Sequence, residues 1–223
     1  RLDPTFAEAY FNRGAAFASI ELYSDAFIHL ERAIQLDPDF EKVYTDRSTL
    51  YGEAGILQRA IYNLRDAINQ DPDNAALYAE RASTYGKMNR NEEALKDYDA
   101  AIGLVSDKPT LYAERGDIHF RLGAFQFALD DYNKAIEMAP TSARFFVMRA
   151  ELYRKVGQID PSFQDFEEAR YLDSRNAEAR YGLGKIWLMV GNFPKTIEHI
   201  DEALELNPDL VDAYYDRGLA FGS

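Results

Sequence analysis

The fold is decided by residues 7–38, which read AEAYFNRGAAFASIELYSDAFIHLERAIQLDP. Tyr10, Gly14 and Phe17 are spaced four and three residues apart, so they share one face of a first helix. A second helix follows and stops before Pro38, since proline cannot continue it. Its apolar face is formed by Ala26, Leu30 and Ala33. The stretch therefore predicts a helical hairpin.

The hairpin recurs every 34 residues. Proline marks five ends of the period and serine fills the two vacant places: Pro4, Pro38, Pro72, Ser106, Pro140, Ser174 and Pro208. Alanine keeps the same spacing in the second helix, at Ala33, Ala67, Ala101, Ala135, Ala169 and Ala203. No insertion interrupts the register, so the chain is predicted to be one uninterrupted array of hairpins.

Turn and packing residues agree with this period. A residue suited to a left-handed backbone follows most first helices: Gly55, Asn89, Gly123, Gly157 and Gly191. Small residues recur inside the first helices, where they let the paired helix approach closely: Gly14, Ser48, Ala82, Gly116, Ala150, Gly184 and Gly218. Pro161 and Pro194 fall at expected starts of second helices, where proline is tolerated.

The pattern resembles the tetratricopeptide repeat family. The family's order of aromatic, glycine, aromatic, alanine, aromatic, alanine and proline appears here as Tyr112, Gly116, His119, Ala128, Tyr132, Ala135 and Pro140. The resemblance covers essentially the whole chain. It implies an all-α fold, a right-handed α-solenoid in which first helices line a concave groove and second helices form the convex back. Partners are then expected in that groove.

The period sets the expected boundaries of a single array over residues 1–223. Six full repeats are expected, at 7–40, 41–74, 75–108, 109–142, 143–176 and 177–210. Residues 1–6 match the tail of a preceding repeat, and residues 211–223 are expected to form the first helix of a further repeat or a cap.

Composition excludes several classes of function. The net charge of −13 opposes binding to nucleic acid, because contact with phosphates needs clustered Lys and Arg. No apolar run approaches the roughly 20 residues of a membrane span, so a folded and soluble chain is expected. The absence of cysteine excludes disulfides and thiolate sites, while the cellular compartment is not encoded.

No catalytic or metal-binding constellation is predicted. His29, His119 and His199 lie in different repeats without the spacing of metal ligands. Gly182 and Gly184 lack the third glycine and the preceding strand of a dinucleotide-binding turn, so they are interpreted as helix-packing residues. The sequence therefore predicts a protein that is not an enzyme and has no cofactor.

Arginine recurs directly before the small residue of the first helices, at Arg13, Arg47, Arg81, Arg115, Arg149 and Arg217. Aspartate recurs in second helices at Asp97, Asp131 and Asp165, and where Leu183 replaces the arginine, His199 replaces the aspartate. We expect these arginines to pair with aspartates of their own or the next repeat as structural contacts. The alternative is an arginine ladder that grips an anionic ligand.

The leading functional hypothesis is a scaffold that binds a protein or peptide in the groove. One alternative is self-assembly by end-to-end stacking through exposed repeat ends, including Val211, Tyr214 and Phe221. Another is a regulatory arm of an enzyme whose catalytic domain lies outside this chain. A receptor for terminal carboxylates is disfavoured, because the corresponding groove column is largely acidic and reads Asn12, Asp46, Glu80 and Glu114.

The groove is predicted to be bipartite. Its central section is expected to be acidic, through Asp46, Glu80, Glu114 and Asp117. Basic residues, among them Arg121, form a margin that the helix dipole would also favour without any ligand. The following section is expected to expose apolar residues, namely Val147, Met148, Tyr181, Leu188 and Met189. The expected ligand carries basic and apolar side chains; alternatively, chain beyond Ser223 covers the apolar residues as a cap.

Overall fold

The computed structural model describes residues 6–19, 23–37, 57 and 60–222. These residues form helices and contain no strand. The labelled helices are α1 (Ala7–Ser19), α2 (Tyr23–Leu36), α4 (Ala75–Lys87), α5 (Asn91–Leu104), α6 (Pro109–Arg121), α7 (Phe125–Met138), α8 (Ala143–Lys155), α9 (Ile159–Leu172), α10 (Ala177–Met189), α11 (Phe193–Leu206) and α12 (Val211–Phe221). Residues 60–70 are also helical.

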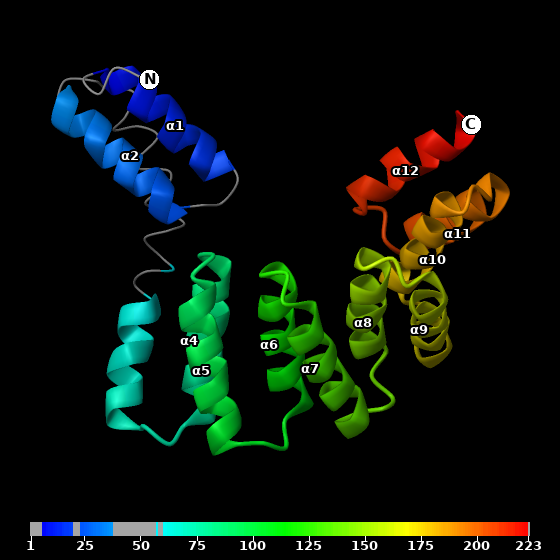
Figure 1. Ribbon diagram of the computed structural model, residues 1–223, viewed down its shortest axis with the longest axis horizontal. Helices are drawn as coiled ribbons and strands as arrows, with labels where there is room; N and C mark the ends of the chain where they lie inside the picture. The colour runs from blue at the N-terminus through cyan, green and yellow to red at the C-terminus, as the bar shows by residue number, and fades with distance from the viewer. Residues whose placement is uncertain (1–5, 20–22, 38–56, 58–59, 223) are drawn as a thin grey trace. The chain divides into compact units, whose positions relative to one another are not determined.

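Helices pack as consecutive hairpins (Figure 1). The chain divides into two compact units, Arg1–Ser106 and Asp107–Ser223. The first unit contains the hairpins α1–α2 and α4–α5, and the second contains α6–α7, α8–α9, α10–α11 and then α12. In the second unit each hairpin packs on the next, so the predicted all-α solenoid of helical hairpins is confirmed.

The turns inside the hairpins have the predicted left-handed geometry. Gly123, Gly157 and Gly191 have φ of +74°, +80° and +77°, and Asn89 has φ of +55°. Glycine has no Cβ to obstruct this conformation, and asparagine tolerates it. The next residue then donates its N–H back into the helix; for example, Ala124 donates to the His119 carbonyl at 2.9 Å. Gly55 lies outside the described residues.

The small residues in first helices allow close contact with the second helix, as predicted. A Cβ added to Gly116 would lie 2.7 Å from the Tyr132 ring, closer than packed atoms approach. A Cβ added to Gly184 would likewise lie 2.7 Å from the Ile200 side chain. A Cβ added to Gly182 would lie 2.3 Å from the ring of Phe166 in the preceding hairpin. Gly182 and Gly184 are therefore helix-packing residues, as predicted.

The aromatic residues of the repeat contribute mainly to the core. Tyr132 and Phe166 are almost fully buried, and Phe146 is buried beside Phe166. By contrast, Tyr214 in α12 is 47% exposed. Pro161 and Pro194 both lie in the first turn of a second helix, where the missing N–H is not needed by the helix ladder.

Candidate partner-binding face

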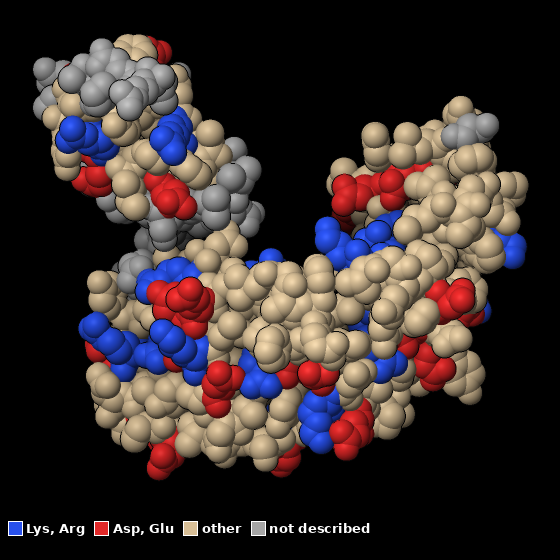
Figure 2. All heavy atoms as spheres, in the orientation of Figure 1, with Lys and Arg blue, Asp and Glu red and all other residues tan. Residues whose placement is uncertain are grey.

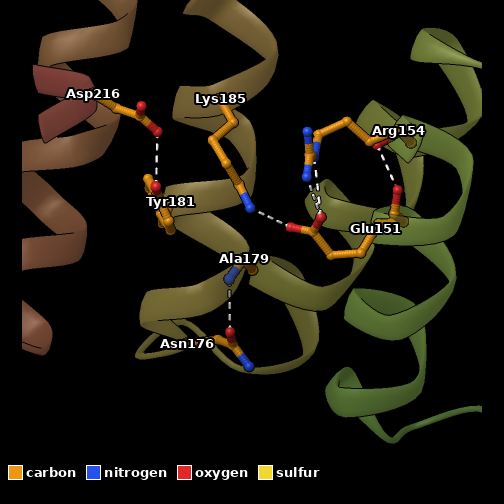
Figure 3. Close-up of polar contacts among 9 residues, drawn as sticks. Glu151, Arg154, Asn176, Ala179, Tyr181, Lys185 and Asp216 are labelled. Atoms are coloured by element: carbon orange, nitrogen blue, oxygen red, sulfur yellow. Dashed lines mark hydrogen bonds and ion pairs between the residues drawn. The ribbon is translucent and has the colours of Figure 1, made fainter. Parts of the chain in front are cut away.

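The first helices of the second unit lie against one another as well as against their own second helices. Within this unit α6 packs on α8, α8 on α10, and α10 on α12. The start of α10 is fixed by Asn176, whose side-chain oxygen accepts a hydrogen bond from the Ala179 N–H at 2.8 Å (Figure 3). Side chains one turn apart on these helices therefore form rows that continue from one helix to the next.

A charged network joins α8 to α10 (Figure 3). The Lys185 ammonium donates to Glu151, and Arg154 donates to the same carboxylate at 2.7 Å and 3.0 Å. Burial alone would raise the pKa of Glu151, but the attraction of Lys185 and Arg154 outweighs it and holds that pKa below its usual value. Glu151 is therefore a charged link between neighbouring repeats.

A second contact joins α10 to α12. The Tyr181 hydroxyl donates to Asp216 at 2.7 Å, and the Lys185 ammonium lies 4.6 Å from the centre of the Tyr181 ring (Figure 3). Burial, together with Asp216, raises the pKa of the Tyr181 hydroxyl, so it stays a donor. We call the surface carrying Glu151, Tyr181, Lys185, Met189 and Asp216 the first-helix face.

Asp117 in α6 is part of a separate, partly buried contact. It accepts a hydrogen bond from the Tyr132 hydroxyl of α7 at 2.7 Å. Burial raises the pKa of Asp117, opposed in part by this hydrogen bond and by the positive charges of Arg144 and Arg121. Asp117 therefore contributes to packing within the α6–α7 hairpin, in addition to its predicted place in the groove.

The polar residues predicted for the groove fall in different parts of the chain. Asn12 and Glu80 are exposed in the first unit, and Asp46 lies outside the described residues. In the second unit Glu114 is half-buried and Arg121 is exposed. Their clustering into one acidic section stays a prediction.

The prediction that five apolar residues face solvent is wrong for Val147. Val147 is buried with Phe166 of its own hairpin and with Leu183 and other residues of the next hairpin, since its side chain fills the space between repeats. Met148 is half-buried because it packs against two core clusters. Tyr181 and Leu188 are half-buried, and Met189 is 54% exposed.

The predicted arginine–aspartate pairs form within single hairpins. Arg115 holds Asp131 with two hydrogen bonds, at 3.0 Å and 2.6 Å, and Arg149 holds Asp165 at 2.7 Å and 2.8 Å. The Arg81–Asp97 pair of the first unit has the same two-bond geometry, at 2.6 Å and 2.7 Å. The three aspartates are buried, so these contacts join first to second helices.

Arg149 also reaches the preceding hairpin, which was not predicted. Its Nη1 donates to the side chain of Asn133 in α7 at 2.6 Å. Arg217 in α12 makes the equivalent backward contact, from Nη1 to Asp201 in α11 at 2.5 Å. The recurring arginine therefore links consecutive repeats as well as the two helices of one repeat.

Comparison with protein families gives the identity of the repeat. One tetratricopeptide repeat model matches residues 79–143 and 147–211, and a second matches residues 7–40. The chain belongs to the tetratricopeptide repeat family. A search of curated protein sequences finds no match.

Solved structures of other tetratricopeptide repeat (TPR) proteins have the same fold. YrrB, described as a TPR protein with an unusual peptide-binding site, is 24% identical over 71% of this chain and 82% of its own, with a TM-score of 0.56. MamA is 18% identical over 73% of this chain and 95% of its own, with a TM-score of 0.61. A chain of the APC/C hetero-tetramer Cut9–Hcn1 is 17% identical over 98% of this chain and 44% of its own, with a TM-score of 0.66.

Membership in the TPR family assigns a general role. TPR arrays bind protein or peptide partners, and they are typically interaction scaffolds without catalytic activity, so the chain is a protein-interaction scaffold. Among the described residues, no group of three or more His, Asp or Glu side chains could hold a metal ion. None of the described helices is both long and apolar enough to cross a bilayer.

Sequence reasoning did not predict that Glu151 would bind Lys185 and Arg154 in this TPR array, or that Tyr181 would bind Asp216. A signal for one pair was present, because Glu151 and Lys185 are 34 residues apart and carry opposite charges. Residues one period apart occupy the same position on adjacent first helices, where they can meet. Asp216 has no comparable signal, since its partner Tyr181 is at a different repeat position.

Proposed function

We propose that this TPR array binds a peptide or protein segment on the first-helix face of its second unit. The ligand places an apolar side chain against Met189 and Leu188, and a basic side chain beside the acidic residues near Tyr181. A long preformed surface built from successive repeats suits such a segment. The description of YrrB as a TPR protein with a peptide-binding site supports this class of ligand.

The observation that carries the proposal is the exposure of Met189 at the end of α10. The corresponding last residue of α4, α6 and α8 is basic: Lys87, Arg121 and Lys155. A cation there stabilises the helix dipole, and α10 has none in its last turn. With Met189 at this position α10 lacks that stabilisation, and an adaptable apolar side chain is 54% exposed instead. This exchange favours a role for Met189 in recognition.

Charge near Tyr181 favours a basic group in the ligand. Asp216, Asp212 and Glu151 all act to raise the pKa of the Tyr181 hydroxyl, so three carboxylates surround it. Glu151 is already balanced by Lys185, whereas Asp212 is exposed at the start of α12. Figure 2 shows acidic side chains over α12 beside basic ones nearer α8 and α10. A ligand Lys or Arg would approach Asp212 and Asp216.

The test uses peptides selected from a random display library against the whole chain. We expect Met189→Ala to weaken the selected peptides about tenfold, because burying an apolar side chain contributes roughly 1.5 to 3 kcal/mol and part of that is lost. Selected sequences should combine a large apolar residue with Lys or Arg. Affinity is measured by fluorescence anisotropy, and the unfolding midpoint of each variant is measured in parallel.

Val190→Ala is the matched control, because Val190 is 55% exposed and adjacent to Met189, but points to another side of the helix end. It should leave peptide affinity unchanged. Tyr181→Phe removes only the hydroxyl that binds Asp216 and keeps the packed ring. If the selected peptides bound the Met189→Ala variant as tightly as the original chain, their binding site would lie elsewhere and the proposal would be wrong.

A further inference from the structure

The turns inside the hairpins of the second unit carry exposed apolar side chains. Between residues 107 and 210, all of which the structure describes, six large hydrophobic side chains are exposed. Four of them lie in or next to these turns and are 49%, 64%, 37% and 55% exposed: Leu122, Phe127, Val156 and Val190. Of the other two, Met189 belongs to the first-helix face and Tyr171 lies in α9. We call the surface that carries the four residues the turn edge.

The side chains of the turn edge are held at fixed positions. Leu122, Val156 and Val190 are one period apart, and the N–H of each donates to the first helix of its own hairpin at 3.0 or 3.1 Å. A glycine with left-handed φ follows each of them. Phe127 in α7 stacks on His119, with 5.3 Å between the ring centres. These turns lie at the end of the hairpins opposite the α7–α8 loop (Figure 1), so the turn edge is a preformed apolar row.

A missing neighbouring repeat does not account for this exposure. The α8–α9 hairpin packs on the hairpin before it and on the hairpin after it, and Val156 in its turn is still exposed. Consecutive hairpins cover one another's flanks, whereas the turns lie at the hairpin ends. Met88, at the equivalent position in the first unit, is buried, so this position is not exposed in every hairpin. The turn edge is therefore a surface that the stacked array itself presents.

Charge beside the turn edge favours an acidic partner. The chain as a whole has 25 basic and 38 acidic residues. The three turn segments, 121–127, 155–161 and 189–195, reverse this balance with three cations and one carboxylate: Arg121, Lys155, Lys195 and Asp160. All four side chains are exposed. The carboxylates of a partner would therefore be attracted by groups that lie directly beside the apolar row.

An anionic membrane would offer similar chemistry but fits this chain less well. A membrane surface extends past the turn edge, where the net charge of −13 repels it. A short acidic segment meets mainly the charges close to it, because charge interactions at physiological salt fade over about 8 Å. The charge distribution therefore favours a protein segment.

We propose that the turn edge binds an acidic amphipathic helix of a protein partner. Helices that pack on one another lie about 10 Å apart, and seven residues of a helix rise by about the same distance. Apolar residues at that interval on the partner match Leu122, Val156 and Val190 in turn. Carboxylates beside them approach Lys155 and Lys195. This site is separate from the first-helix face and does not depend on the function proposed for that face.

The probe is a capped, fluorescent peptide with the sequence LEALEAELEALEAEL, which has leucines at that interval and glutamates between them. Anisotropy measures its binding to the whole chain, and the unfolding midpoint of each variant is measured in parallel. We expect saturable binding that Val156→Asp weakens about tenfold or more, because it removes the central apolar contact and sets a negative charge against the glutamates. Lys155→Glu should also weaken binding, although it leaves the apolar row intact.

Tyr171→Asp is the matched control, since Tyr171 is exposed in the same hairpin but lies outside the turn edge. It should bind the peptide like the original chain, as should Met189→Ala on the first-helix face. Equal binding to Val156→Asp, or no binding to the original chain, would overturn the proposal. So would binding to phosphatidylserine–phosphatidylcholine vesicles, or dimers seen by light scattering, that Val156→Asp abolishes, because the occupant would then be a membrane or a second copy.

Discussion

Lys185 in α10 binds Glu151 in α8, and the two residues hold the same position in consecutive repeats. Glu151→Gln removes the charge from this half-buried link. We expect a loss of about 1.5 to 3 kcal/mol in the free energy of unfolding at neutral pH, the range for hydrogen bonds to charged groups. Chemical denaturation measures it, and Glu168→Gln, at an exposed glutamate in α9, should change little.

The loss of stability caused by Glu151→Gln should depend on pH. Because the folded-state pKa of Glu151 is below its ordinary value of 4.5, its contribution is fully present above that pH. The contribution is lost as pH falls from about 4.5 through the lower folded-state pKa. The stability difference between the original chain and Glu151→Gln should therefore shrink over this window. A difference that stayed constant would contradict the charged link.

Asp117 should behave in the opposite way. Burial raises its folded-state pKa above 3.8, so protonation favours the folded state, and the chain gains stability as pH falls through the raised pKa toward 3.8. Asp117→Asn removes this gain and keeps an oxygen that can accept from Tyr132. Thermal melting against pH compares it with Asp130→Asn at an exposed site. Identical pH profiles would show that Asp117 keeps its ordinary pKa.

Arg115→Ala tests the structural role of the arginine series. It leaves Asp131 buried without its two-bond partner, so we expect a loss of about 3 to 5 kcal/mol in the free energy of unfolding. Removing both partners together should cost less than the two single changes added. If Arg115→Ala abolished partner binding and left thermal stability untouched, the arginine would be a ligand contact instead.

Gly116 and Gly218 occupy the same repeat position in different surroundings. Gly116→Ala places a Cβ 2.7 Å from the Tyr132 ring, and such overpacking costs about 1 to 3 kcal/mol. Gly218→Ala meets open space and should stabilise α12 by about 0.5 to 1 kcal/mol, the helix preference of alanine over glycine. Unfolding midpoints of the two variants should move in opposite directions. Equal destabilisation would mean that the α12 face is covered.

The sequence by itself determined the repeat and its local chemistry. A 34-residue period with its own turn residues specifies each hairpin, because helix ends and left-handed turns depend on the residues at those positions. It also predicted that the recurring arginines would pair with aspartates of their own or the next repeat, and Arg115 binds Asp131 of its own hairpin. These features are local to one repeat, and each repeat contacts mainly its neighbours.

Only the tertiary structure decided which first-helix residues are accessible. Val147 and Met189 are both apolar residues assigned to the groove, yet Val147 is buried against the next hairpin and Met189 is exposed. The link between Glu151 and Lys185, and that between Tyr181 and Asp216, likewise depend on how neighbouring first helices pack. The periodicity of one helix gives a side chain's direction, whereas burial depends on the side chains that the adjacent repeat brings against it.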